Sequence, residues 1–422
     1  MRKIQKMILL ILLLSSCRES LTSKNSTEKI LSTIFEDYYQ FKDRINPIEA
    51  TKGGNFQYND CVANYISDSY QEEIIENYTS FLNRLDKLDE SELSEADQLS
   101  LKVMKWDCEI KLEGLKSPIV VITSPIYNLP SFELMPLTQI QSLHLYIAQL
   151  GAGESVHPFI TVKDYDDWLK RIDDYIVFLD TSISMMKEGM IKKIVLPSVL
   201  TQKTINQLDE FINKSISEHL FYKPIKFMRK GIDTKQRNRL EDEYSNMIAY
   251  KLKPAYVKLK RFLVEEYLPV CRKTSGFKDL PKGKETYDSL LKLHTTTNLS
   301  ADQIHKLGKE EVKRILIDME DVKNKIGFKG DIKAFFEFIR KSPKQMPFKE
   351  PHEVLNNFNR IKEKINEKFD QVFKSRPKAS FVVRRTEAFR EASASAEYVP
   401  GTKDGSRPGI FYVPIPDINE YN

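Results

Sequence analysis

The sequence is poor in the residues from which metal sites and disulfide frameworks are built. It has only six histidines and four cysteines in 422 residues, and no two cysteines have the spacing of a zinc site. It also lacks a Gly-x-Ser-x-Gly elbow, a phosphate-binding glycine loop and a dinucleotide fingerprint. The sequence therefore contains no motif that would indicate a serine hydrolase, a nucleotide-binding protein or an NAD-dependent enzyme.

The sequence also lacks a marked excess of charge of one sign. Its 65 lysines and arginines and its 60 aspartates and glutamates give a formal charge of +5. Three of the basic residues lie in the first six positions, which leaves 62 against 60 in the rest of the chain. Nucleic acids and anionic lipids bind clustered basic surfaces, and the sequence has no long lysine–arginine run. We therefore expect no nucleic-acid partner.

The N-terminal apolar run is too short to be a membrane-spanning helix. It extends from Met7 to Leu14, whereas crossing a bilayer core takes about 20 apolar residues. A basic start precedes it, and the small residues Ser15 and Ser16 separate it from Cys17. This order is typical of a secretory signal that ends in a lipobox. We predict that residues 1–16 form the signal peptide and that the thiol of Cys17 receives lipid.

Lipidation at Cys17 predicts a protein that is tethered to a membrane of the bacterial cell envelope. One acyl chain holds a protein at a membrane only marginally, so the multiply acylated end of a lipoprotein is a firm anchor. Residues 17–26 are polar and rich in serine and threonine, which is typical of a flexible tether. Residues 27–422 then form the body. The inner and the outer membrane remain alternatives.

Apolar residues recur with the 3.6-residue period of amphipathic helices along most of the body. Three of the stripes run from Ile30 to Tyr39, from Ile74 to Leu85 and from Tyr165 to Leu179. The sequence therefore predicts a mainly α fold, with a large multi-helix bundle-like body.

Local signals predict where helices begin and where one is divided. Thr161 with Asp164, and Ser300 with Gln303, have the spacing of capping boxes at helix N-termini. Pro254 lies inside a long apolar pattern, and because proline removes a backbone donor it should kink or divide that helix.

The length of the body suggests either two lobes or one large helical body, and two lobes would divide into residues 27–275 and 276–422. Beyond Pro377 the residue pattern changes. The segments Ser380 to Val383 and Ile410 to Val413 are rich in β-branched and aromatic residues, which is typical of strands. We expect a small strand element near the C-terminus.

The histidines include one partial zinc motif. The segment His352-Glu353-Val354-Leu355-Asn356 begins like the zinc-peptidase helix, but Asn356 stands where the second histidine is needed. Pro351 directly precedes it, so we interpret this segment as the first turn of a helix. His294 and His305 have no third ligand at helical spacing, and we expect them to have structural roles.

Two further residues with reactive side chains are predicted to lie in the core. His144 stands in an apolar stretch, and Cys108 is in register with Leu101 and Met104. Once Cys17 is lipidated, Cys61, Cys108 and Cys271 are the remaining cysteines, so at most one intramolecular disulfide can form and one thiol stays unpaired.

Four segments of the sequence, in their order along the chain, resemble those of a known family. They are Leu280 to Tyr287, His294 to Thr297, Gln303 to Val312, and Asp404 to Val413. In this order they resemble the bacterial family called domain of unknown function 885. The combination is specific, although each segment alone is not.

The resemblance implies an exported lipoprotein similar to zinc metallopeptidases of the helical HExxH type. In such relatives, the segment resembling Gly405 to Val413 leads into a zinc-binding His-Glu helix, which a further glutamate ligand follows. The present sequence is given to Asn422, and none of its residues matches these ligands. We therefore expect no metal ligand and no catalytic residue on this chain, with zinc confined to full-length relatives.

The same resemblance suggests residues on the substrate side of a cleft. The strand Ile410 to Val413 is expected at the edge of the cleft, where an extended peptide can add backbone hydrogen bonds. Arg407 is a candidate partner for a substrate carboxylate because its fork geometry suits one. His294 and Tyr412 are candidates for polar contacts. In the structural alternatives, Arg407 holds the glycine-rich loop, Tyr412 packs in the core and His294 caps the next helix.

Two functions remain open from the sequence. The first is a truncated or split product of a zinc-peptidase-like envelope lipoprotein that is inactive alone. The alternative is a non-catalytic envelope lipoprotein that binds or scaffolds other molecules, with peptide as a candidate ligand. Whether the chain is an enzyme stays undecided at this stage.

Overall fold

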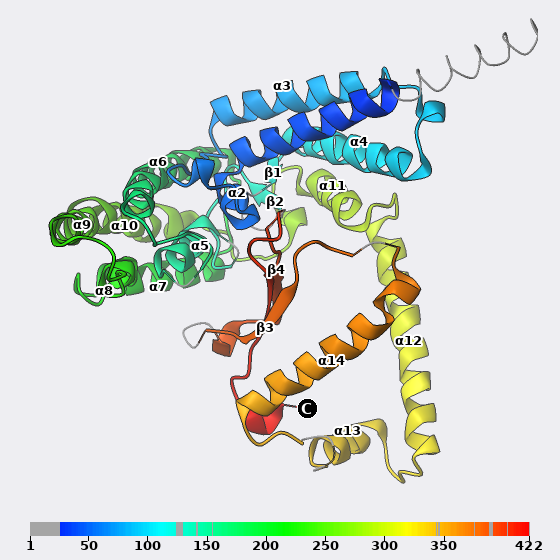
Figure 1. The fold of residues 1–422 in the computed structure, drawn as a ribbon. Helices are drawn as coiled ribbons and strands as arrows, with labels where there is room; N and C mark the ends of the chain where they lie inside the picture. The colour runs from blue at the N-terminus through cyan, green and yellow to red at the C-terminus, as the bar shows by residue number, and fades with distance from the viewer. Residues whose placement is uncertain are drawn as a thin grey trace, which may run out of the picture. The chain divides into compact units, whose positions relative to one another are not determined.

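The computed structural model describes residues 26–123, 130–140, 142–153, 155–342, 344, 347–374, 376–387, 391–402 and 404–421. Cys17, the predicted signal peptide and most of the predicted tether lie outside the described residues. The described chain is mainly helical, with short strands near the C-terminus (Figure 1), which confirms the predicted fold class. None of the described helices has the length and apolar character that a membrane span requires.

The chain divides into two compact units. The first unit contains the described residues of Met1–Thr51 and Asn55–Thr297, and the second contains those of Lys52–Gly54 and Asn298–Asn422. The sequence placed the boundary about 20 residues earlier, near the break at Pro281 to Gly283. The units divide later because the helix after this break packs on the first unit, where the Thr286 hydroxyl lies 3.0 Å from that of Ser117.

Three helices build the N-terminal part of the first unit and lie side by side (Figure 1). They are the helix over residues 26–45, α3 (Asp68–Leu85) and α4 (Glu95–Leu115). The hydroxyls of Ser67 and Ser94 cap α3 and α4 by accepting free backbone N–H groups of the first turn. Their apolar stripes meet in one core, to which Leu31, Ile34, Phe41, Ile74, Phe81, Leu101, Met104 and Cys108 contribute.

A larger core holds the central helices of the first unit together. These helices are α2 (Pro47–Gly53), α5 (Leu143–Gly151), α6 (Val162–Lys192), α7 (Ser198–Ile212), α8 (Lys223–Lys226), α9 (Thr234–Asn246) and α10 (Lys253–Phe262). Thr161 and Asp164 form the predicted capping box of α6. The longest helix, α6, buries the aromatic side chains of Trp168, Tyr175 and Phe178 completely. His144 is also buried, between Ser142 and Gln207, which confirms its predicted core position.

Pro254 divides the long helical stretch as the sequence predicted. Between α9 and α10 the backbone widens into a π-helical segment, Met247–Leu252, and α10 begins directly afterwards with Pro254 in its first turn. A proline ring clashes with the carbonyl four residues earlier in a regular helix, and a widened turn relieves that clash. A second π-helical segment, Leu263–Tyr267, follows α10.

A small hairpin and one more helix complete the first unit. Strands β1 (Val121–Thr123) and β2 (Pro130–Phe132) pair antiparallel, and α11 spans Gly283–Thr295. The sequence did not predict the hairpin, because strands of three residues are too short to show an alternating pattern. Short 3-10 helices connect these elements at Phe56–Tyr58, Glu90–Glu92, Leu220–Tyr222, Leu268–Val270 and Phe277–Asp279.

The second unit contains three amphipathic helices. They are α12 (Ala301–Lys325), α13 (Ile332–Arg340) and α14 (Pro351–Val372). Ser300 and Gln303 form the predicted capping box of α12. Pro351 opens α14, and the Glu353 carboxylate accepts the backbone N–H of Glu350 at 3.1 Å, so this segment is a helix first turn as predicted.

A three-stranded sheet lies in the same unit. Its strands are β3 (Phe381–Arg385), β4 (Glu397–Val399) and β5 (Gly409–Val413), and two further 3-10 helices span Glu391–Ser393 and Ile418–Glu420. The strand order is β3-β5-β4, in which β5 pairs parallel with β3 and antiparallel with β4. The core of this unit is small, since Val354, Val413 and Ile415 are its only fully enclosed apolar cluster among the described residues.

Candidate functional site

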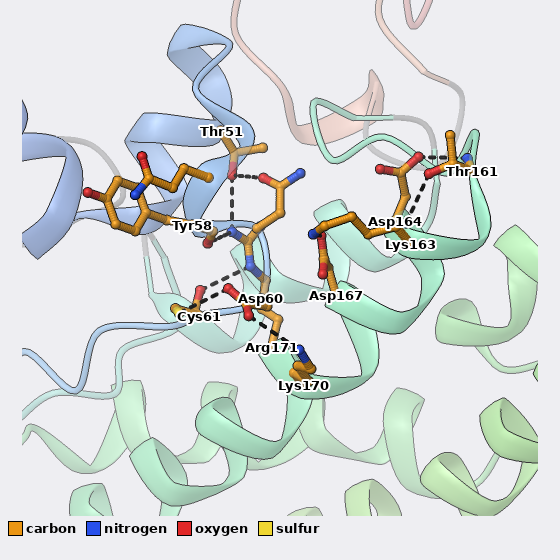
Figure 2. Close-up of polar contacts among 12 residues, drawn as sticks. Thr51, Tyr58, Asp60, Cys61, Thr161, Lys163, Asp164, Asp167, Lys170 and Arg171 are labelled. Atoms are coloured by element: carbon orange, nitrogen blue, oxygen red, sulfur yellow. Dashed lines mark hydrogen bonds and ion pairs between the residues drawn. The ribbon is translucent and has the colours of Figure 1, made fainter.

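A buried arginine in the first unit organises polar groups without forming a ligand site. The Arg171 guanidinium donates to the carbonyls of Cys61 at 3.0 Å and Tyr58 at 2.7 Å, and to the Thr51 hydroxyl at 3.0 Å (Figure 2). Burial lowers the pKa of Arg171 to about 10. Because its donors are directed at the chain itself, Arg171 fastens the segment after α2 to α6.

The best candidate site is a pocket between α4 and α11. Its volume is 180 Å³, and it lies wholly within the first unit. Apolar side chains form most of its wall, and both helices also contribute charged or polar side chains. The lining residues on α4 are Trp106, Asp107, Ile110, Lys111, Glu113 and Gly114, those on α11 are Ser289, Leu290, Leu293 and His294, and Val121 and Pro130 come from the hairpin.

An ion pair on α4 provides the polar side of this pocket. Lys111 Nζ lies 2.5 Å from Asp107 Oδ2, one helical turn away. The same oxygen accepts the hydroxyl of Tyr38, which comes from the helix over residues 26–45. The side chain of Lys111 is only 6% exposed and that of Asp107 is 27% exposed, so the two opposite charges share a largely dry environment.

Lys42 lies next to this pair and has an unusual proton affinity. Burial, and then the positive charge of Lys111, lower the pKa of the Lys42 amine to about 7, although Asp107 acts in the opposite direction. For Asp107, burial alone would raise the pKa of the carboxyl, but Lys111 and Lys42 outweigh burial and hold it below its usual value. The carboxylate therefore stays charged, and Lys42 is the group that titrates near neutral pH.

Helix α11 closes the pocket from the other side and is tied to α4 by charge. Lys292 Nζ lies 2.5 Å from Glu113 Oε2. This contact places Leu290 and Leu293 against the apolar wall and leaves the imidazole of His294 exposed at the rim. The pocket therefore combines apolar side chains with one ammonium and two carboxylates.

The structure places His294 in this pocket and the other two cleft candidates elsewhere. His294 lies in the last turn of α11, so it does not cap the helix that follows. Arg407 and Tyr412 belong to the second unit, while His294 belongs to the first. The prediction that these residues contact a substrate stays a prediction.

Arg407 is engaged by the backbone of its own unit. Its guanidinium donates to the carbonyls of Pro400 at 3.1 Å and Pro408 at 3.5 Å, and also to that of Lys52. Burial lowers the pKa of Arg407. Tyr412 is only 8% exposed and lies in β5. These contacts agree with the structural alternatives, in which Arg407 holds the glycine-rich loop and Tyr412 packs in the core.

The strand Ile410 to Val413 cannot add backbone hydrogen bonds to an extended peptide in the way that we expected. Strand β5 lies in the middle of the sheet, with Val383 and Tyr398 as the neighbours of Phe411 on its two sides. The backbone groups of a central strand are already paired, so an added peptide cannot bond to them. The sequence missed this arrangement because β4 is too short to be recognised as a partner.

Metal ligands do not gather in the part of the chain that the structure describes. No group of three His, Cys, Asp or Glu side chains there is arranged to hold a metal ion. The cysteines Cys61, Cys108 and Cys271 are all free thiols. Burial raises the pKa of Cys61 to about 11 and that of Cys108 to about 12, so both remain protonated at neutral pH.

The sequence analysis did not predict the ion-pair cluster, although the sequence contains a signal for it. Lys42 falls within the apolar stripe that also contains Tyr38 and Phe41, and Lys111 falls within the stripe of Cys108 and Leu112. A charged lysine that is buried by an apolar stripe needs an opposite charge or hydrogen-bond acceptors nearby. Two such lysines on neighbouring helices therefore point to a buried polar cluster.

The fold and the pocket define a helical, two-unit protein with a charged cluster in its first unit. The chain belongs to the family described as "Bacterial protein of unknown function (DUF885)", whose model matches residues 47–422. This confirms the family resemblance that the sequence segments indicated. No curated protein matches the chain.

One solved structure shows how far the fold is shared. The chain is similar to "the putative lipoprotein from Colwellia psychrerythraea", with a TM-score of 0.79 at 21% sequence identity. The similarity covers 93% of this chain and 68% of that one. At this level of identity, the two proteins share their fold.

Proposed function

We propose that this protein is a lipid-anchored envelope protein whose first unit binds a small zwitterionic ligand, such as the end of a peptide. One observation carries the proposal: Asp107 and Lys111, which have opposite charges, share the wall of a pocket that is otherwise largely apolar. Ligand sites are typically apolar hollows with a few well-placed polar groups, and this pocket has that composition.

Each part of such a ligand has a matching group in the pocket. A carboxylate suits the Lys111 ammonium, and an amine suits the carboxylates of Asp107 and Glu113. An apolar side chain fits against Leu290 and Leu293. A cavity of about 150 Å³ holds a molecule the size of benzene, so 180 Å³ accepts one side chain with its charged end groups. The rest of a longer ligand would extend past His294 into solvent.

Calorimetric titration with a leucine-containing dipeptide tests this proposal. We expect the free dipeptide to bind at least about tenfold more tightly than its N-acetylated or C-amidated form, a difference of about 1.4 kcal/mol. Lys111→Met should abolish the preference for a free carboxylate, and His294→Ala at the rim should weaken binding with less effect on folding. Lys102→Met, on the exposed face of the same helix, is the matched control. Equal binding of free and blocked peptides, or no binding at all, would refute the proposal.

The lipid anchor is supported by the N-terminal sequence and by the fold. The lipobox Leu14-Ser15-Ser16-Cys17 follows a basic start and a short apolar run, and the solved relative of the same fold is described as a putative lipoprotein. In cells fed a labelled fatty acid, the native chain should take up label and fractionate with membranes. Cys17→Ser should accumulate as unlabelled precursor, and persistent labelling of that variant would rule out this anchor.

Zinc-peptidase activity is the property that the family resemblance raises, and we propose that these residues do not perform it. Asn356 stands in place of the second histidine of the local motif, and His352 instead lies 3.2 Å from Glu350 in a helix first turn. We expect the purified protein to hold no stoichiometric zinc and to hydrolyse no peptide. Elemental analysis that finds one tightly held zinc per chain would overturn this.

A further inference from the structure

Helix α13 leaves most of its apolar surface uncovered. Five of its nine residues carry large apolar side chains, and the structure buries one of the five, Phe335. Phe336 is 37% exposed and Phe338 is 51% exposed. In the turn before the helix, Ile326 is 59% exposed. Apolar side chains that gather on a surface in this way mark a place where a protein meets a partner.

The turn between α12 and α13 is held by specific contacts, so these side chains have fixed positions. The Lys323 amine on α12 donates to the Gly330 carbonyl at 2.7 Å. Phe328 packs on α13, where its ring centre lies 5.4 Å from that of Phe335 and 5.1 Å from that of Phe338. Aromatic pairs at such distances attract each other beyond the effect of burial. The exposed rings therefore extend from a folded base.

The charge around this helix is positive. Residues 326–349 contain six lysines and arginines and only two acidic residues, Asp331 and Glu337. Asp331 caps the first turn of α13, and Glu337 forms an ion pair with Arg340 at 2.9 Å. The other charged side chains of the segment are basic and exposed, and they belong to Lys329, Lys333, Lys341, Lys344 and Lys349.

This excess of positive charge distinguishes α13 from the other helices of the second unit, which also expose apolar side chains. Apart from His305, α12 contains six basic and six acidic residues, and apart from His352, α14 contains four of each. Neither of these two helices therefore favours a partner of one charge. The basic side chains around α13, next to exposed phenylalanines, are complementary to a partner that is anionic at its surface and apolar beneath it.

We propose that α13 and the turn before it, residues 326–341, dock on the anionic phospholipid surface of the membrane. This proposal rests on the lipid anchor proposed above, because the anchor holds the body within reach of that surface. Phe336 and Phe338 enter the boundary between headgroups and acyl chains, and Lys333 and Lys341 contact lipid phosphates. Each basic side chain near an anionic surface strengthens the attraction, and salt weakens it.

Hydrogen exchange of the full lipidated protein, reconstituted in vesicles, tests the proposal. The vesicles consist of phosphatidylcholine alone, or of phosphatidylcholine with about 30% phosphatidylglycerol. The amides of residues 326–341 should exchange at least about fivefold more slowly in the anionic vesicles, because a docked helix opens less often. About 0.5 M salt should remove this difference. Exchange in α14 should be the same in both kinds of vesicle.

Variants identify the side chains that dock. Phe336→Ser combined with Phe338→Ser should abolish the difference between the two kinds of vesicle. Lys333→Gln combined with Lys341→Gln should also abolish it. Ile365→Ser, at a position of α14 that is 57% exposed, is the control and should retain the difference. Each variant is compared with itself in two lipids, so an altered stability of the variant does not imitate the result.

Three outcomes decide between this proposal and its alternatives. Equal exchange of residues 326–341 in both kinds of vesicle would overturn it. Protection that rises with protein concentration in detergent, without any effect of the lipid, would also overturn it and would indicate a second protein as the partner. Flotation of the neutral vesicles reports the anchor separately, because only a lipidated chain stays with them.

Discussion

Lys111 and Asp107 stand one turn apart on α4, with Nζ 2.5 Å from Oδ2, and both face the same pocket. Because Lys111 is almost fully enclosed, its ammonium depends on this carboxylate for compensation. Asp107 also accepts the Tyr38 hydroxyl from the neighbouring helix. One carboxylate thus supports the packing of two helices and forms part of the pocket wall.

Asp107→Asn should destabilise the protein strongly. The substitution leaves Lys111 and Lys42 without a negative partner in the core, and breaking a buried pair in this way typically costs about 3 kcal/mol. Urea denaturation should show a lower midpoint with an unchanged slope. Glu109→Gln, an exposed position on the same helix, should change the midpoint little. Equal midpoints for both variants would mean that the ion pair does not support the fold.

The stability of the protein should rise between pH 7 and pH 9. The pKa of Lys42 is about 7 in the folded protein and 10.5 in an unperturbed lysine. In this window the unfolded chain therefore binds more protons than the folded one, and the free energy of unfolding increases with pH, by at most about 1.4 kcal/mol per pH unit. Lys42→Met should flatten the slope. A native protein whose stability is constant or falling from pH 7 to pH 9 would contradict the lowered pKa.

Helix α12 should make the protein associate as its concentration rises. Along one face it exposes Val312 by 58%, Leu316 by 47% and Val322 by 50%, and soluble monomers rarely expose so long an apolar stripe. Val312→Glu combined with Leu316→Lys should reduce the association seen by light scattering. Glu310→Lys on another face of α12 is the control. Concentration-independent scattering by the native protein would show that the exposed stripe is harmless.

Arg407→Met should loosen the loop before β5. The change removes donors to the carbonyls of Pro400 and Lys52, which should lower the free energy of unfolding by about 2 kcal/mol. Arg407→Lys should restore little of this, because a single amine cannot reproduce the fork of a guanidinium. Hydrogen exchange of residues 401–409 would report the effect locally. Unchanged exchange together with weakened peptide binding would instead favour a role in substrate contact.

The helices could be predicted from the sequence because their signals are local. Thr161 with Asp164, and Ser300 with Gln303, are three residues apart and form capping boxes where expected. The central place of β5 could not be predicted in this way, because it depends on pairing with β4, a three-residue strand. Strand order is a property of distant segments, and periodicity within one segment carries no information about it.

Only part of the candidate site could be predicted from the sequence. Lys42 and Lys111 interrupt apolar stripes, which marks them as buried charges that need partners. Nothing local, however, indicates that α11 packs on α4, nearly 180 residues earlier in the chain, through Lys292 and Glu113. His294 was selected for its place in a family segment, and only the three-dimensional packing relates it to Asp107 and Lys111.

The start of α11 sets a limit on how this pocket can vary. A Cβ atom at Gly283 would lie 1.7 Å from the Phe277 carbonyl oxygen, so no other residue fits there without moving the backbone. Leu290, Leu293 and His294 follow on the same helix. The backbone at the start of α11 therefore depends on a glycine at position 283, and the side chains that this helix contributes to the pocket follow from that fixed start.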